Sequence, residues 1–260
     1  MKCGSSILQG SNWGKITTGI LLTSSAAIAL ALPVRALTFS TDRAAFNSND
    51  SLDWSSLGKI FAPPIDASDF LPFSFSATSQ QGLGLNVNVP FPPVGSGITP
   101  PFVFQTLPPP QGIPTNFAPG DFILFSGLLP GRFPAPGNPG PLTITFDKPV
   151  LAAGTQIATD DTPFFTGFIS AFDKDNNLLG EFSAPGTSSV TLDNSALFLG
   201  VRSDTANISK LVFQTSVPGR AIGINTLSLD RASVPESSIP ALGWILGAIG
   251  VGLIRRRSQH

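Results

Sequence analysis

Proline is concentrated in one stretch of this chain, and that stretch limits what the chain can fold into. Residues 61–140 hold 17 of the 25 prolines. Because proline donates no backbone hydrogen bond, it is excluded from helix interiors and from central strands. We therefore expect long loops here, above all over 90–119. The same stretch carries only four charged side chains: Asp66, Asp69, Asp121 and Arg132.

Short strands are still expected wherever apolar and polar residues alternate. Every second residue over 83–89 is apolar, which is typical of a strand with one buried face. Phe73 and Phe75 alternate in the same way, and residues 121–125 form a short apolar run. From residue 141 onward the pattern is more regular and predicts strands at 142–146, 156–159, 168–172, 178–182, 196–201, 210–214 and 222–229.

Two local features refine this prediction. The polar segment 173–177 separates two strand-like runs, so 168–182 is expected to form a hairpin. In the last strand the apolar side chains change parity, and a β-bulge near Asn225 would bring them back to one face. These side chains are Ile222, Ile224, Leu227 and Leu229.

Helical signals are scarce. Ser40, Thr41 and Asp42 can cap one short N-terminal helix over 43–46, and 52–54 is expected to be an early strand. Many short strands with almost no helix predict an all-β fold, a jelly-roll-like antiparallel β-sandwich over 37–232. Within it, 61–140 forms a loop-rich half and 141–230 a regular half.

The N-terminus is expected to be a signal peptide over residues 1–36. Lys2 and Lys15 precede an apolar run at 20–32, and Pro33 ends that run. Small residues then fit a cleavage site between Ala36 and Leu37. The alternative, a retained membrane anchor, is disfavoured because the run is shorter than a spanning helix.

The C-terminal segment 233–260 reads as a membrane-sorting tail. A Val234-Pro235-Glu236 motif precedes an apolar run at 239–254, which is expected to form a C-terminal transmembrane helix. The arginines at 255–257 would stay in the cytoplasm by the positive-inside rule. The run has 16 residues, fewer than the ~20 usually needed to span a bilayer. Temporary membrane anchoring is therefore favoured over permanent anchoring.

This arrangement of motif, short apolar helix and terminal arginines resembles the PEP-CTERM sorting signal. In that family a membrane protease-transpeptidase, exosortase, recognises the motif and cuts near it. The family has Val-Pro-Glu-Pro, whereas this chain has Ser237 at the fourth position. The resemblance implies signal peptidase and exosortase as processing partners, transient membrane insertion, and a final location at the cell surface or outside the cell. The alternative is a plain C-terminal anchor.

The body also resembles PEP-CTERM exoproteins of undetermined activity. The matching segments are 149–157, 169–182, 198–214 and 224–229, and the resemblance begins near the TDRAAF sequence at 41–46. It implies a jelly-roll-like sandwich similar in outline to carbohydrate-binding modules, and it brings no catalytic residue.

Several kinds of chemistry are excluded by composition. The only histidine is His260 and the only cysteine is Cys3, so the body between the two ends lacks a histidine base, a cysteine nucleophile and the usual zinc ligands. Residues 37–254 carry sixteen acidic against nine basic side chains, a net charge of −7. A body of that sign repels phosphate backbones, so nucleic acid is not an expected partner.

Carboxylates remain as candidate functional groups. Two of them could form a glycosidase acid–base pair if they faced each other, but Asp and Asn more often bond to the backbone in turns. Asp173, Asp175 and Asn177 begin like a calcium loop, although Leu178 and Ala184 stand where an EF-hand needs Gly and Glu. A structural calcium stays open, and no other cofactor is expected. The carboxylates that could supply the acid–base pair are Asp160, Asp161, Asp173, Asp175, Asp193 and Asp204.

The phenylalanines of the loop-rich half allow two interpretations. They could form an exposed binding face, or they could pin the loops to the core; the second is favoured because phenylalanine has no polar tip. These residues are Phe91, Phe102, Phe104 and Phe117. We expect a non-enzymatic surface or extracellular-matrix protein that binds extracellular polysaccharide. The alternatives are a glycan hydrolase using paired aspartates and a self-associating coat protein.

Overall fold

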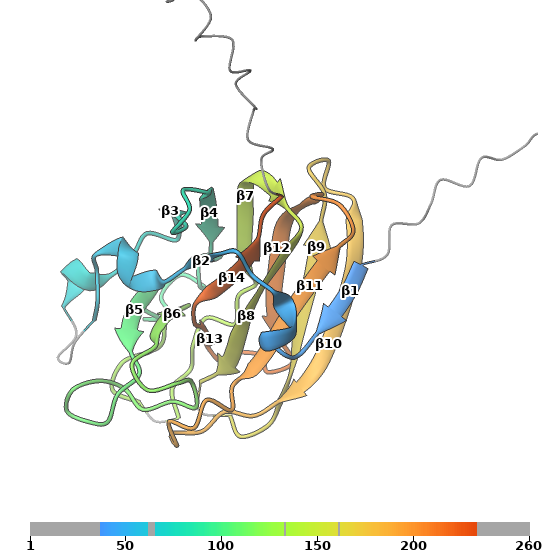
Figure 1. Ribbon diagram of the computed structural model, residues 1–260. Helices are drawn as coiled ribbons and strands as arrows, with labels where there is room; N and C mark the ends of the chain where they lie inside the picture. Colours follow the sequence, from blue (N-terminus) through green and yellow to red (C-terminus); the bar gives the residue numbers. More distant parts are fainter. Residues whose placement is uncertain (1–36, 62–65, 133, 161, 233–260) are drawn as a thin grey trace, which may run out of the picture. The chain divides into compact units, whose positions relative to one another are not determined.

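A computed structural model describes residues 37–61, 66–132, 134–160 and 162–232 (Figure 1). The predicted signal peptide and sorting tail lie outside these residues, and so do several sites named above. They are Ala36, Asp161, Val234, Pro235, Glu236 and the arginines Arg255, Arg256 and Arg257. Leu37, which follows the predicted cleavage site, is the first residue of a strand.

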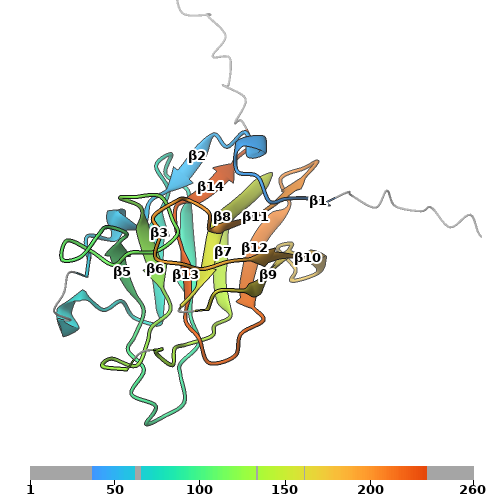
Figure 2. The ribbon, with the colours of Figure 1, turned by 90° about the horizontal axis from the view of Figure 1, so that it is seen from below.

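Across the described ranges, fourteen strands form two antiparallel sheets, which confirms the predicted all-β class. The larger sheet has the order β1-β11-β8-β13-β6-β5, and β14 pairs with both β8 and β2. In both views β2 and β14 lie side by side (Figures 1 and 2). The strands are β1 (Leu37–Ser40), β2 (Asp50–Leu52), β5 (Phe102–Gln105), β6 (Phe122–Phe125), β8 (Ala152–Thr159), β11 (Leu197–Ser203), β13 (Ile222–Ile224) and β14 (Leu227–Asp230).

The smaller sheet has the order β10-β9-β12-β7-β4-β3. Its edge strand β10 contains Pro185, which is tolerated there because an edge strand leaves some N–H positions unpaired. The expected hairpin is present as β9 and β10. The strands are β3 (Ser74–Thr78), β4 (Gly84–Asn88), β7 (Leu142–Val150), β9 (Phe165–Phe172), β10 (Leu178–Gly186) and β12 (Ile208–Thr215).

The two sheets pack face to face over one apolar core. Ile144 and Leu211 of the smaller sheet belong to the same buried cluster as Ile157 and Leu199 of the larger one. Burying such side chains is the main favourable term in folding, at about 25 cal/mol for each Å² of apolar surface removed from water. At one side of the core β1 and β10 come together, where the rings of Phe39 and Phe182 stack at 5.2 Å between centroids.

The bulge predicted near Asn225 is present. Ile224 pairs with Ile157, and Ser228 pairs with Gly154, so the chain advances four residues while β8 advances three. That extra residue corrects the change of parity. All four apolar side chains that the prediction concerned join the shared core: Ile222, Ile224, Leu227 and Leu229.

The bulge also centres a buried network of hydrogen bonds. The Asn225 side chain is 1% exposed; its Oδ1 accepts from Arg43 Nη2 at 2.6 Å, and its Nδ2 donates to Asp121 Oδ2 at 2.7 Å and to Gln156 Oε1 at 2.6 Å. The Asn225 carbonyl accepts from Trp54 Nε1 at 2.8 Å. Burial lowers the pKa of Arg43, and the charge of Asp121 opposes that change. The network ties the N-terminal turn to the last strands.

Three local predictions need correction. The helix expected over 43–46 is a single 3-10 turn, Ala44–Phe46, with Asp42 Oδ1 accepting from the Ala44 N–H. The strand expected at 52–54 ends at Leu52, because the Asp53 carboxylate caps a second 3-10 helix, Trp54–Leu57. The segment 90–119 is not all loop, because residues 102–107 contain no proline and β5 forms within them. This strand lies at the end of the larger sheet.

Candidate functional site

The larger sheet has a second apolar face that points away from the shared core. On β5, Val103 joins the core between the sheets, and on β6 Leu124 does the same. Because side chains alternate along a strand, their sequence neighbours point the opposite way. Those neighbours form a separate buried cluster, which includes Phe102, Phe104, Ile123 and Phe125.

A cavity of about 590 Å³ lies over this face. Part of its wall is made by Ala158 of β8 and Gly223 of β13, which are paired across the sheet. Both are small, and a Cβ on Gly223 would lie 3.0 Å from Ile123 Cγ2 and 3.4 Å from Phe125 Cδ2. The cavity therefore depends on small residues where two strands pair. Its size falls in the range of pockets that bind small molecules.

Two loops, 106–121 and 187–196, flank the cavity, and hydrogen bonds tie them to each other. The N–H groups of Leu192 and Ala196 donate to the carbonyls of Thr115 at 2.9 Å and Asn116 at 3.0 Å. The Asn116 Nδ2 donates to the Thr187 carbonyl at 2.8 Å. Figure 1 shows the green proline-rich loops and the orange loop after β10 at the same lower end of the molecule. These hydrogen bonds hold the two loops in one arrangement beside the cavity.

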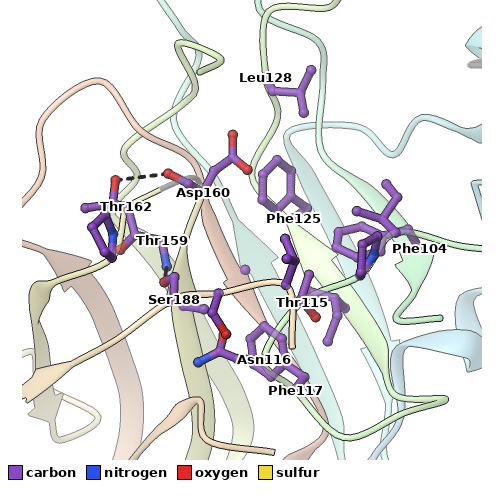
Figure 3. Close-up of a pocket in the computed structure, with 18 of the residues that line it drawn as sticks. Phe104, Thr115, Asn116, Phe117, Phe125, Leu128, Thr159, Asp160, Thr162 and Ser188 are labelled. Atoms are coloured by element: carbon purple, nitrogen blue, oxygen red, sulfur yellow. Dashed lines mark hydrogen bonds between the residues drawn. The ribbon is translucent and has the colours of Figure 1, made fainter. Parts of the chain in front are cut away.

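The cavity has a polar side and an aromatic side (Figure 3). Thr159, Asp160, Thr162 and Ser188 gather on one side, and the rings of Phe104, Phe117 and Phe125 lie on the other. On the polar side Thr162 Oγ1 donates to the Asp160 carbonyl at 3.0 Å, and the Thr159 N–H donates to Ser188 Oγ at 2.9 Å.

Two residues of this lining each carry a buried side-chain oxygen that has no hydrogen-bond partner among the described residues. They are Asn116 Oδ1 and Thr159 Oγ1, and the Thr159 side chain lies on the core-facing side of the sheet with that of its paired residue Ile222. Leaving a buried donor or acceptor unbonded costs about 1–3 kcal/mol, so native proteins seldom do it without a reason.

The loop phenylalanines divide between the two interpretations. Phe102, Phe104 and Phe117 are buried and pack as the favoured interpretation expects, yet they also line the cavity. Phe91 is 80% exposed and packs its ring against Phe73 at 4.3 Å between centroids. The aromatic surface is thus an internal wall and not an open face.

The predicted carboxylates are placed at different ends of the fold. Asp160 lines the cavity beside the start of β9, whereas Asp173 and Asp175 follow the other end of that strand. An eight-residue strand spans about 25 Å, which is too long for a glycosidase pair. The carboxylate of Asp193 accepts from the Ser195 N–H at 3.1 Å, and Asp204 lies in the bend after β11.

The possible calcium loop forms the turn of the β9–β10 hairpin. Asp173 Oδ1 accepts from the N–H groups of Asp175 at 2.8 Å and Asn177 at 2.9 Å, and Asp173 Oδ2 accepts from Asn177 Nδ2 at 2.9 Å. The Asp175 carboxylate forms an ion pair with Lys174 at 2.7 Å. Within the described ranges no three His, Cys, Asp or Glu side chains are grouped to hold a metal ion.

We expect the pKa of Asp173 to lie below its ordinary value of 3.8, because hydrogen bonds from Asn177 favour the ionised carboxylate. Because the pKa is lowered, the ionised Asp173 carboxylate stabilises the turn at pH values above the ordinary pKa. This stabilisation is lost as the pH falls through the lowered pKa. A carboxyl-detected NMR titration measures this directly. An Asp173 pKa at or above 3.8 would contradict the expectation.

The fold and the cavity define this chain as a two-sheet all-β protein with an apolar, ligand-sized site. No known protein family and no curated protein matches it. A crystal structure of a DUF4465 family protein from Bacteroides caccae is similar with a TM-score of 0.35 and 12% identity, over 75% of this chain and 100% of that one. A similarity of this extent does not assign the chain to that family.

In the described residues no helix has the length and apolar character needed to cross a bilayer, and 239–254 lies outside them.

Proposed function

We propose that this chain is an exported, non-catalytic surface protein whose body holds a small, mostly apolar molecule. The observation that supports the proposal is the cavity of about 590 Å³ with its wall of phenylalanine side chains. Apolar walls with a few convergent polar groups are the common composition of small-molecule sites. We expect the site to bind its ligand without changing it, because its walls offer apolar contact and hydrogen bonds.

The export part of the proposal comes from the chain ends. A signal peptide over 1–36 and a PEP-CTERM-like tail over 233–260 would deliver the body to the surface, with exosortase as the processing partner. The jelly-roll-like character of the two sheets and the transmembrane helix at 239–254 belong to the same proposal.

The cavity favours an apolar ligand over the polysaccharide expected from the sequence. A sugar chain brings many hydroxyl groups, each of which needs a partner when it is buried. The aromatic wall consists of phenylalanine, and the whole sequence contains no tyrosine. The polysaccharide partner stays a prediction that a glycan array tests. The self-associating coat is tested by sedimentation at high concentration.

Binding of the neutral fluorophore N-phenyl-1-naphthylamine tests the proposed cavity. We expect its emission to rise on binding, and we expect Ala158→Trp to weaken binding at least tenfold because the indole occupies the cavity. Ala158 lines the cavity, whereas the exposed Ala45 lies in the 3-10 turn Ala44–Phe46.

The control is Ala45→Trp, which adds the same ring outside the cavity and should leave the affinity unchanged. If the purified protein does not bind the fluorophore, or binds it equally well with tryptophan at position 158, the proposed function is wrong.

A further inference from the structure

We propose that the ligand of this cavity is an organic cation with an apolar body and one protonated amino group, which pairs with the Asp160 carboxylate. The proposal rests on the proposed function and adds the chemical class of the ligand. It is carried by the position of Asp160, which is the charged residue of the described lining and lies on the cavity face of the larger sheet.

The strand pairing sets the direction of the Asp160 side chain. Ala158 pairs with Gly223, and two residues further on the Asp160 N–H donates to the Ala221 carbonyl at 2.9 Å. Because side chains alternate along a strand, Asp160 points to the same side as Ala158. Ala158 and Ala221 both belong to the apolar cluster of the cavity face. In Figure 3 the Asp160 carboxylate points toward the ring of Phe125.

The carboxylate also lies nearer to water than the apolar wall does. Phe117 and Ile123 are 1% and 0% exposed, whereas Asp160 is half-buried. Burying two opposite charges completely would cost several kcal/mol for each ion, which their attraction only partly returns. At a half-buried site an ammonium group keeps part of its hydration, while the apolar body of the ligand is buried, as a lysine side chain does at a protein surface.

The charges around the cavity favour a cation over an anion. None of the described lining residues is Lys or Arg. The flanking loops 106–121 and 187–196 carry one charged residue each, Asp121 and Asp193. A carboxylate or phosphate ligand would lose hydration without meeting a cation, and Asp160 would repel it. The phenylalanine wall adds to this preference, because the face of an aromatic ring attracts a cation within about 6 Å of its centroid.

A protonated amine also fits better than a neutral molecule or a metal ion. A neutral ligand would take water from Asp160 without offsetting the loss, whereas an ammonium group donates charge-assisted hydrogen bonds. A carboxylate has several lone pairs, so Asp160 can bond to the ligand while it keeps its interactions within the protein. Calcium takes about six to eight oxygen ligands, and no three acidic, His or Cys side chains are grouped among the described residues.

Three probes with one ring system test this proposal: 2-naphthylmethylamine, 2-naphthylmethanol and 2-naphthoate. At neutral pH the first is a cation, the second is neutral and the third is an anion. Each is titrated into the purified full-length protein as a competitor of N-phenyl-1-naphthylamine. We expect the amine to bind about tenfold tighter than the alcohol, the gain of one charge-assisted hydrogen bond, and 2-naphthoate to bind more weakly than both.

The variant Asp160→Asn removes the charge and keeps the size of the side chain. It should weaken binding of the amine about tenfold and leave the affinities for the alcohol and the fluorophore within about twofold, which also shows that the cavity is intact. The matched control is Asp193→Asn. Asp193 is exposed on the loop 187–196 and lies outside the lining, so this variant should keep the preference for the amine.

The outcomes separate the two proposals, and the comparison of probes on the unchanged protein needs no variant. Binding of the alcohol or of 2-naphthoate as tight as that of the amine, or an unchanged preference in Asp160→Asn, would overturn the inference while the apolar cavity stands as a binding site. An equal loss of preference in Asp193→Asn would overturn it too, because the attraction would then come from the negative surface in general. No binding of any probe, the fluorophore included, would overturn the proposed function itself.

Discussion

Replacing Asn225 with alanine is expected to lower the free energy of unfolding by about 3–5 kcal/mol. The side chain is 1% exposed and bonds to Arg43, Asp121 and Gln156. Its removal leaves the half-buried Arg43 guanidinium and Asp121 carboxylate, and the buried Gln156 amide, without the group that joins them. A polar or charged group that loses a hydrogen-bond partner costs more when it is shielded from water than when it is exposed. Chemical denaturation followed by tryptophan fluorescence measures the change, because Trp54 donates to the Asn225 carbonyl.

Asn88→Ala is the matched control for this variant. Asn88 is exposed on β4, and its loss should change the free energy of unfolding by no more than about 0.5 kcal/mol. If the two variants were equally stable, the network around Asn225 would not hold the N-terminal turn to the last strands.

Replacing Phe102 with alanine is expected to lower the free energy of unfolding by about 3–5 kcal/mol, the usual range for a buried aromatic side chain. Phe102 is 2% exposed, and its ring contacts four other rings at 5.2–6.2 Å between centroids. The rings are those of Phe61, Phe70, Phe104 and Phe125. Thermal or denaturant unfolding gives the magnitude.

The control for Phe102→Ala is Phe164→Ala. Phe164 is 78% exposed, so truncation should change the stability by no more than about 0.5 kcal/mol. Phe102 also lines the cavity, and its truncation should weaken binding of N-phenyl-1-naphthylamine because a wall contact is lost. A Phe102→Ala protein as stable as Phe164→Ala would show that the aromatic cluster does not support β5 and β6.

Much of the β-structure follows from local sequence pattern. Alternation over 83–89 and 142–146 places β4 and β7, because one face of each strand must be buried. The bulge at Asn225 is also predictable, since a change of parity within one apolar strand has few other solutions. Two strands were not predicted: β1 alternates over only four residues, and β5 has no alternation. Both form by pairing, β1 with β11 and β5 with β6.

The candidate site could be predicted only in part from the sequence. The phenylalanines Phe102, Phe104 and Phe117 were identified as important, and their packing role was the favoured interpretation. The small residues Ala158 and Gly223 carry no local signal, because only the pairing of β8 with β13 brings them together.

The sequence alone determined the all-β class, most strand positions and the absence of histidine and cysteine chemistry from the body, since these depend on periodicity and residue types. Only the tertiary structure decided that the aromatic side chains enclose a cavity and that Asp160 is separated from Asp173 and Asp175 by the length of β9. The physical reason is that periodicity specifies which face of a strand is buried, whereas a cavity arises from contacts between residues far apart in the chain.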